Sequence, residues 1–283
     1  MTKPVATVIL PTFNHGATLR FALESALAQT VPVEVFIIGD GVPDADKTLI
    51  RHLVANDARV RFFDRPKHVS RGEPYRHEAL QSARGTIVCY LCDRDLWFPD
   101  HVAKLAHLLK NADFAHAFPL QIMPGDQLKF FPTDLSIGAF RHMMLAVWNR
   151  VPFSAAAHTL AFYRRLETGW ETTPPGVPTD WHFLRKFLAH DDCRCISGPD
   201  PTAITFPSPP RLDWSVEQRL EELTRWRQRI DTDAKRKEVT LAILKAAIRD
   251  RDQVIAKAYI KLYGRSPPAP ADGSGIGASA AAQ

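Results

Sequence analysis

The sequence predicts an α/β protein, with a mostly parallel central sheet, helices on both faces and a C-terminal helical extension. Short apolar segments alternate with amphipathic segments over residues 1–112, which is typical of parallel strands joined by helices. Polar clusters follow three of the apolar segments, at residues 11–16, 40–44 and 93–95. Because parallel strands end at one edge of a sheet, where such proteins bind ligands, these clusters are expected to share one site.

Four apolar segments have the composition of buried strands. The first, residues 5–10, reads Val-Ala-Thr-Val-Ile-Leu and ends at Pro11. Three more are rich in β-branched and aromatic residues, at residues 33–41, 59–66 and 86–91. Short apolar runs bounded by Gly, Pro or Asp indicate strands that are covered on both faces.

The segments between and after these strands have helical periodicity. In residues 12–30 the apolar side chains recur at spacings of three and four, as Leu19, Leu23, Ala26 and Leu27. This spacing predicts one apolar helix face. Similar patterns predict three further helices, at residues 44–57, 73–85 and 98–112. The third of these four helices is expected to end at Gly85, a residue type that favours helix C-termini.

The middle of the chain has a weaker pattern. Residues 114–123 and 154–166 are expected to form strands, and residues 193–211 one or two short strands before a proline-rich exit. Residues 179–190 predict a helix capped by Thr179 or Asp180. Its apolar face consists of Phe183, Leu184, Phe187 and Leu188.

Two helices are predicted after Trp214, at residues 215–230 and 231–263. In the second, apolar residues recur every seven positions, as Leu241, Ile248, Ile255 and Leu262. This stripe can pack on the domain, form a homodimer or lie on a membrane surface. Acidic residues on the polar face favour packing or dimerisation, although peripheral membrane contact stays open.

The composition is that of a globular protein, with 45% hydrophobic and 24% charged residues. The formal net charge of +5 suits an anionic partner but does not choose among a nucleotide, a phospholipid surface and a nucleic acid. No apolar run approaches the roughly 20 residues that span a bilayer. The N-terminal apolar segment is too short for a signal peptide. A cytoplasmic protein is therefore expected.

The four cysteines are too few for a disulfide framework. Cys89 and Cys92 have a spacing that is typical of zinc and redox sites. They lie in a predicted strand, however, where residues three apart point to opposite faces. We therefore expect buried structural thiols.

Four blocks resemble the family-two inverting glycosyltransferases, which have the A-type nucleotide-sugar-binding fold. The blocks read VILPTFNHGATLRFALESALAQT, VEVFIIGDGVPDAD, YRHEALQSARGTIVCYLCDRDLWFPDHV and GWETTPPGVPTDWHFLRKF. Each motif alone is weak, but four in the right order are fairly specific. The resemblance covers residues 4–190, and the helices after residue 212 lie outside it.

The resemblance implies a division of the chain. Residues 1–210 would form a nucleotide-sugar-dependent glycosyltransferase domain, with a donor-binding half at 1–112 and an acceptor half at 113–210. Residues 211–264 would form a helical extension and residues 265–283 a disordered tail, rich in Ala, Gly, Ser and Pro.

The resemblance also implies a nucleotide-binding set. Pro11 and Thr12 would border the nucleobase, and Asp40 would accept a hydrogen bond from a uracil-like base, so a UDP-type donor is favoured. The family's Asp-Asp pair has become Gly39-Asp40 in this sequence. Asp40 followed by glycine is also a common turn dipeptide. The nucleotide-sugar-binding residues implied by the resemblance also include Arg71, Arg76, Asp93 and Arg94.

The acidic motif Asp93-Arg94-Asp95 falls where the family binds a metal. Asp93 and Asp95 are the expected ligands, because carboxylate oxygens suit Mg²⁺ or Mn²⁺. Arg94 occupies the position of the aspartate closest to the metal, and an arginine repels a cation. Either a carboxylate still binds the metal while Arg94 pairs with another, or Arg94 itself meets the diphosphate. The two aspartates could also cap the following helix.

Asp180 falls where the family has the aspartate that deprotonates the acceptor hydroxyl. One such base suffices for a single displacement with inversion. The alternative for Asp180 is an N-cap of its helix. The neighbouring Trp181 and His182 are candidates for contact with the acceptor.

The implied function is transfer of a sugar from a nucleotide sugar to an acceptor hydroxyl in polysaccharide or glycoconjugate synthesis. The acceptor would be a glycan, a lipid-linked glycan or a protein, and no nucleic-acid partner is expected. Action on a lipid-linked acceptor would place the protein at the inner face of the membrane. The alternative is a non-catalytic nucleotide- or glycan-binding protein with a glycosyltransferase-like domain, which Gly39 and Arg94 would fit.

Overall fold

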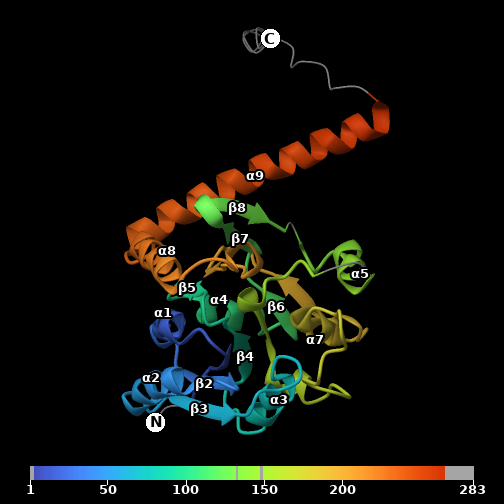
Figure 1. Ribbon diagram of the computed structural model, residues 1–283. Coiled ribbons are helices and arrows are strands. Elements are labelled where there is room, and N and C mark those ends of the chain that lie inside the picture. Colours follow the sequence, from blue (N-terminus) through green and yellow to red (C-terminus); the bar gives the residue numbers. More distant parts are fainter. Residues whose placement is uncertain (1–2, 132, 147–148, 265–283) are drawn as a thin grey trace, which may run out of the picture. The chain divides into compact units, whose positions relative to one another are not determined.

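The computed structural model describes residues 3–131, 133–146 and 149–264 (Figure 1). The chain divides into two compact units, Met1–Ile243 and Leu244–Gln283. The first unit contains the central sheet and all the predicted site residues. The expected tail at 265–283 lies outside the described residues.

Among the described residues, seven strands form the central sheet in the order β10-β6-β9-β4-β1-β2-β3. Strand β9 is antiparallel to its neighbours β4 and β6, and the other pairings within this sheet are parallel. The predicted mostly parallel sheet is thus confirmed. The strands are β1 Ala6–Thr12, β2 Val33–Asp40, β3 Val60–Arg65, β4 Ile87–Tyr90, β6 Phe114–His116, β9 Ala156–Thr159 and β10 Cys195–Ser197.

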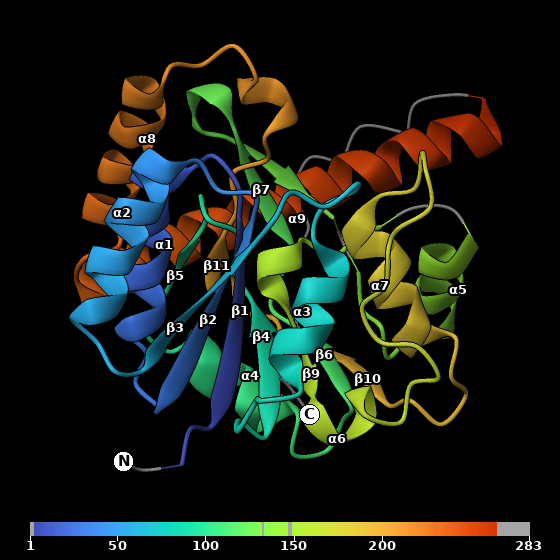
Figure 2. The same cartoon turned by 60° about the horizontal axis from the view of Figure 1, so that its bottom comes forward.

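Helices cover both faces of this sheet (Figure 2). Successive residues of β1 point to opposite sides, so Val8 and Leu10 join one apolar cluster and Ile9 the other. The first cluster includes side chains of α1 Gly16–Leu27, α2 Asp44–Ala55 and α4 His101–Leu108. The second includes side chains of α3 Glu73–Leu80, α5 Gly138–Ala146, α6 Leu160–Tyr163 and α7 Thr179–Leu188.

The expected C-cap at Gly85 is wrong, because α3 ends at Leu80. Gly85 instead lies where the chain crosses β1. A Cβ atom on this residue would come within 2.3 Å of the Thr7 backbone nitrogen. Glycine is therefore required by the close approach of two backbones.

Within the first unit, a third apolar cluster packs α8 Val216–Arg229 against the rest of the fold. Phe206, Leu223 and Trp226 belong to it. Two small sheets lie beside it, β5 Leu96–Trp97 with β11 Ala203–Ile204, and β7 Leu120–Met123 with β8 Gln127–Phe130. Short 3-10 turns occur at η1 Pro124–Asp126, η2 Phe153–Ala155 and η3 Pro209–Arg211. Helix α8 therefore packs with the unit that contains the sheet. The predicted end of the glycosyltransferase domain at residue 210 stays a prediction.

Helix α9, Asp233–Tyr263, crosses the division between the two units. The seven-residue stripe within it is exposed, with relative accessibilities of 54% for Leu241, 51% for Ile248, 59% for Ile255 and 77% for Leu262. No helix in the described ranges is long and apolar enough to cross a membrane. The partner of the stripe stays a prediction.

Candidate functional site

The polar segments that follow β1, β2 and β4 meet at one edge of the sheet, as expected. Thr12 pairs in register with Gly39, next to Asp40, at the ends of β1 and β2. Strand β4 lies on the other side of β1 and leads into Asp93. Parallel pairing therefore brings the three sequence-distant clusters to one edge.

Asp40 anchors the loop of residues 67–72 to this edge. Its carboxylate is buried and accepts hydrogen bonds from Lys67 Nζ at 2.5 Å and from the backbone nitrogen of His68 at 2.6 Å. Gly72 has φ = 66°, and a Cβ there would lie 3.0 Å from the Asp40 Cβ. Each carboxylate oxygen has a second lone pair, so contact between Asp40 and a base stays a prediction.

Glu73, which the sequence did not single out, connects this loop to helix α7. Its fully buried carboxylate accepts hydrogen bonds from Ser70 Oγ (2.9 Å), the Arg71 backbone nitrogen (2.9 Å) and Thr179 Oγ1 (3.3 Å). Burial alone would raise the pKa of Glu73, but the hydrogen bonds lower it to about 2. Glu73 thereby ties the Asp40 loop to the start of the helix that carries Asp180.

Substitution of Glu73 by glutamine is expected to destabilise the fold at pH 7 by roughly 2–3 kcal/mol, by linkage. A lowered pKa means that the carboxylate stabilises the native state above its unfolded pKa. This stability is lost as the pH falls from about 4.5 towards about 2. Denaturant unfolding of Glu73→Gln should therefore show a weaker pH dependence across this window. Glu78→Gln, on the exposed face of the same helix, is the control, and equal effects of the two variants would contradict the role of Glu73.

Arg76 presents a buried guanidinium at the same edge. Its Nη2 donates to the backbone oxygen of Arg71 at 2.8 Å. Its Cζ lies 4.6 Å from the ring centroid of Trp170 and 5.8 Å from that of Phe153. Within the described residues its Nε has no hydrogen-bond partner.

Burial disfavours the charged form of the Arg76 side chain. Burial lowers the pKa of Arg76, although the carboxylates of Glu73 and Asp40 act in the other direction. No described ion pair neutralises this guanidinium directly. A buried cation with an unused donor is a suitable binding group for an anion such as a phosphate.

Asp93 and Arg94 pair with each other in the acidic motif. Asp93 is 3% exposed, and its Oδ1 lies 3.4 Å from Arg94 Nη1. Its Oδ2 lies 3.2 Å from Nδ1 of His15, a residue absent from the predicted set. Burial would raise the pKa of Asp93, but His15 and Arg94 outweigh it and hold the pKa below its usual range. Arg94 thus pairs with a carboxylate, whereas metal binding by this motif and contact of Arg94 with a diphosphate both stay predictions.

Asp95 is occupied by structural hydrogen bonds. Its Oδ2 accepts from Ser154 Oγ at 2.5 Å and its Oδ1 from the Phe206 backbone nitrogen at 2.8 Å. Arg94 Nε donates to the Phe206 oxygen at 3.0 Å. Burial raises the pKa of Asp95 to about 6. Asp95 therefore fixes Ser154 and the backbone at Phe206 in place. It is not a helix cap, since α4 begins at His101.

The donor set does not fit a divalent cation well. Both oxygens of Asp95 already accept hydrogen bonds, and the guanidinium of Arg94 lies against Asp93, where it would repel a cation. In the part of the chain that the structure describes, no group of three or more His, Cys, Asp or Glu side chains could hold a metal ion. The expected Mg²⁺ or Mn²⁺ would have only Asp93 as its carboxylate.

Asp180 lies in the first turn of α7, after the N-cap residue Pro178. Its Oδ2 accepts a hydrogen bond from Asn149 Nδ2 at 3.0 Å, and its Oδ1 from the backbone nitrogen of Trp181 at 2.9 Å. Burial raises the pKa of Asp180, and the charge of Arg71 acts in the opposite direction. Asp180 is therefore not the N-cap, and its raised pKa suits a general base.

The two acceptor candidates beside Asp180 have structural partners. Trp181 Nε1 donates to the Met144 backbone oxygen at 2.5 Å, which fixes the indole against α5. His182 Nε2 lies 3.4 Å from Glu171 Oε1. Their contact with an acceptor stays a prediction.

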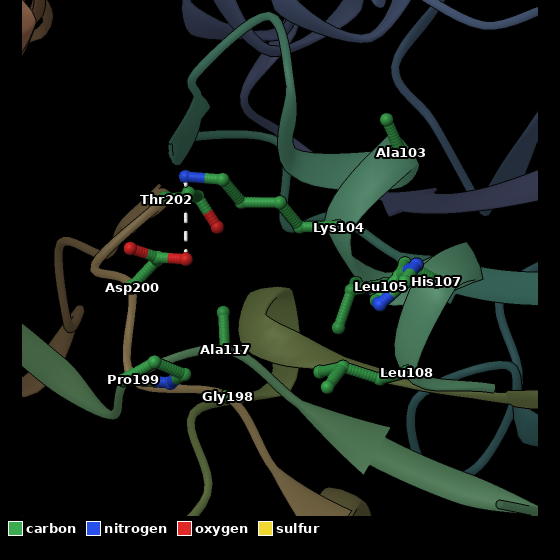
Figure 3. Close-up of a pocket in the computed structure, with 10 residues that line it drawn as sticks. All are labelled: Ala103, Lys104, Leu105, His107, Leu108, Ala117, Gly198, Pro199, Asp200 and Thr202. Atoms are coloured by element: carbon green, nitrogen blue, oxygen red, sulfur yellow. Dashed lines mark ion pairs between the residues drawn. The ribbon is translucent and has the colours of Figure 1, made fainter. Parts of the chain in front are cut away.

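A separate pocket of about 370 Å³ lies away from these residues (Figure 3). Its walls come from α4 and from the segment that follows β10. Lys104 Nζ points to Asp200, with 3.3 Å between Nζ and the carboxylate. None of the predicted site residues lines it. The predicted site residues therefore lie at the sheet edge, away from this pocket, which is mainly apolar.

The fold is that of an α/β protein with a cluster of polar side chains at the carboxyl ends of a mostly parallel sheet, which is where such folds bind ligands. Residues 7–169 match the family described as glycosyl transferase family 2. This match covers more than half of the 283 residues, so the chain belongs to that family. The predicted family is thus confirmed; the match covers the first three sequence motifs and ends at residue 169, where the fourth begins.

Curated relatives match only part of the chain. The GalNAc(5)-diNAcBac-PP-undecaprenol beta-1,3-glucosyltransferase of Campylobacter jejuni is 27% identical over 41% of this chain and 37% of its own length. The succinoglycan biosynthesis protein ExoO of Rhizobium meliloti is 32% identical over 40% of this chain and 31% of its own. The chain thus spans less than half the length of these relatives.

Solved structures share the fold. TarS 1–349 of S. aureus in complex with UDP-GlcNAc has a TM-score of 0.58 and 14% identity, over 84% of this chain and 71% of its own. The mannosyltransferase PcManGT of Pyrobaculum calidifontis, in complex with GDP-Man and Mn²⁺, has a TM-score of 0.52 and 19% identity. The match covers 95% of this chain and 67% of PcManGT. At these identities the likeness supports the A-type fold alone.

Proposed function

We propose that the protein is an inverting glycosyltransferase that moves a sugar from a nucleotide sugar to an acceptor hydroxyl. One observation carries this proposal: the loop of residues 67–72, together with Glu73 at the start of α3, links the proposed donor edge to the candidate base. The loop is tied to Asp40 at one end, and at the other Glu73 contacts Thr179, next to Asp180. The groups needed to bind a nucleotide diphosphate and to activate a hydroxyl therefore belong to one connected structure.

In this function the nucleotide lies along the sheet edge. Pro11, Thr12 and Asp40 border the base, for which uracil is favoured. Arg76, with its unused Nε, faces the diphosphate, together with Arg71 and Arg94. Positive side chains stabilise the charge that develops on the departing diphosphate.

Asp180 removes the proton from the acceptor hydroxyl as that oxygen attacks the sugar. A single displacement of this kind inverts the anomeric centre. Asn149 and the Trp181 nitrogen hold the carboxylate in position. Trp181 and His182 are the neighbouring side chains proposed to contact the acceptor.

The acceptor is proposed to be a glycan or a lipid-linked glycan in polysaccharide or glycoconjugate synthesis. Two relatives support this choice, because their names refer to an undecaprenol-linked substrate and to succinoglycan biosynthesis. A lipid-linked acceptor would bring the protein to the inner membrane face. Homodimerisation or membrane contact through the exposed stripe of α9 is compatible with this function.

The function is tested by incubating the purified chain with a panel of UDP-, GDP- and dTDP-sugars, with and without Mn²⁺. Release of the nucleoside diphosphate from at least one donor is expected, by slow hydrolysis or by transfer to an added acceptor. Absence of both turnover and binding across the whole panel would contradict the proposal.

A further inference from the structure

Helix α8 reaches the acidic motif through Arg219. Nη1 of Arg219 lies 3.3 Å from Nε2 of His15, whose Nδ1 lies 3.2 Å from Asp93 Oδ2. Helix α8 also lies beside α1, the helix that begins directly after His15 (Figure 1). A side chain from the helical extension, outside the region of family resemblance, thereby joins the donor edge.

A buried ion pair between Arg211 and Glu222 holds α8 in this position. Arg211 is 1% exposed, and its Nε and Nη2 each donate to the Glu222 carboxylate at 2.6 Å. Nη2 also donates to the Ile122 backbone oxygen at 2.9 Å. Bidentate pairing of this kind fixes direction as well as distance. Arg219 Nη2 then donates to the Arg211 oxygen at 2.5 Å, so the position of Arg219 depends on that of Arg211.

Two guanidinium groups converge on Asp93. Arg94 and Arg219 both reach it, one directly and one through His15. In the acidic motif, the oxygens of Asp95 accept hydrogen bonds from Ser154 and from the Phe206 backbone. The oxygens of Asp93 do not take part in these bonds. Two guanidinium groups bring a formal charge of about +2, equal to that of one divalent cation, and present forks that match phosphate oxygens.

We propose that Arg94 and Arg219 together bind the diphosphate of the donor in place of a divalent cation, which makes α8 a part of the donor site. The proposal rests on the proposed glycosyltransferase function. The contacts described above use Nε and Nη1 of Arg94, so donors remain on its guanidinium for phosphate. Asp93 contacts Arg94, and His15 connects Asp93 to Arg219, so the two arginines belong to one chain of contacts.

Isothermal titration calorimetry of UDP into the full chain tests this, in buffer with EDTA and in buffer with Mn²⁺. UDP is expected to bind in EDTA with an affinity within about threefold of that in Mn²⁺, since the arginines supply the charge. Arg219→Met is expected to weaken UDP binding in EDTA by about tenfold or more, because the variant loses one charge-assisted hydrogen bond to phosphate. Arg225→Met, on the same helix but paired with Asp126, is expected to bind UDP like the native chain.

The possible outcomes separate this inference from the function. UDP binding that requires Mn²⁺, or unchanged binding by Arg219→Met, would overturn the inference and leave the function standing. Binding of neither UDP nor GDP in either buffer would overturn both. If Arg219→Met fails to fold by circular dichroism, Arg219→Lys keeps the charge but not the fork and is expected to weaken binding to a smaller degree.

The reverse substitution gives an independent test. Arg94→Asp removes one guanidinium and places a second carboxylate beside Asp93. UDP binding by this variant is expected to be lost in EDTA and to return with Mn²⁺, because paired carboxylates and phosphates suit that ion. Unimpaired binding in EDTA would contradict a role for Arg94.

Discussion

Asp180→Asn is expected to lower sugar transfer by about 10³-fold, within the range for loss of a general base, while UDP affinity stays unchanged. The substitution preserves the shape of the side chain. Its amide oxygen can still accept the hydrogen bond that Asp180 Oδ1 takes from the Trp181 nitrogen. The rate constant and the affinity, measured on the donor that the panel identifies, separate the loss of proton transfer from loss of binding.

The pH profile gives a second signature of the same carboxylate. Burial raises the pKa of Asp180, so the base is protonated at a higher pH than an ordinary aspartate. Transfer should therefore fall as the pH drops through this raised pKa, and the acidic limb should disappear in Asp180→Asn. A raised pKa means that ionisation opposes folding, and removing the charge therefore offsets the loss of the hydrogen bond from Asn149, which the amide nitrogen of the variant cannot accept.

Asp191→Asn, an exposed aspartate after the same helix, is the matched control and is expected to transfer normally. Full activity of Asp180→Asn would remove Asp180 as the base. Nucleotide binding without turnover by the native chain would instead favour the non-catalytic alternative.

Arg76→Met is expected to weaken nucleoside diphosphate binding by about 100-fold without lowering the melting temperature. The guanidinium is buried over Trp170 and Phe153, and burial disfavours its charged form, as the lowered pKa shows. Methionine replaces this charge with a flexible apolar side chain that suits the same aromatic surroundings. The loss of about 2–3 kcal/mol of binding energy corresponds to a charge-assisted hydrogen bond to phosphate.

Arg61→Met controls for the loss of an arginine that stacks on aromatic rings. Arg61 Cζ lies 4.9 Å from the Phe36 ring and 4.8 Å from that of Phe63, on an exposed strand position. Binding by Arg61→Met is expected to match that of the native chain. A large loss of stability in Arg76→Met with little loss of binding would make Arg76 a structural residue.

The sequence predicted the first half of the fold well, because strong apolar segments there coincide with clear turn residues. Residues 154–166 show the limit of such patterns. They were expected to form one strand, yet β9 ends at Thr159 and α6 follows. The Thr159 hydroxyl accepts a hydrogen bond from the Phe162 nitrogen at 3.2 Å and caps this short helix. The apolar pattern of a segment does not show that a hydroxyl within it will cap a short helix and so end the strand.

The candidate site was predicted only where a residue carries a motif. Asp40, Asp93 and Asp180 follow recognisable patterns, and the topology brings the first two to one edge. Glu73 looks like an ordinary acidic residue in a first helical turn, and its role depends on a contact with Thr179, 106 residues away. Arg219 depends in the same way on the long-range packing of α8. Contacts of this kind have no local sequence signal.

The acidic motif also shows why a residue pattern does not determine a ligand set. The spacing of Asp93 and Asp95 is that of metal ligands. In the fold, however, Asp95 fixes Ser154 and the Phe206 backbone, and Arg94 pairs with Asp93. We therefore propose that arginines from two distant segments supply the positive charge for the diphosphate.

The location of the donor site is tested most directly by a crystal structure of the chain with UDP bound. We predict the uracil beside Thr12 and Asp40, and the diphosphate in contact with Arg76 and Arg94. UDP bound without contact to these residues, for example in the pocket beside Lys104 and Asp200, would contradict the proposed site.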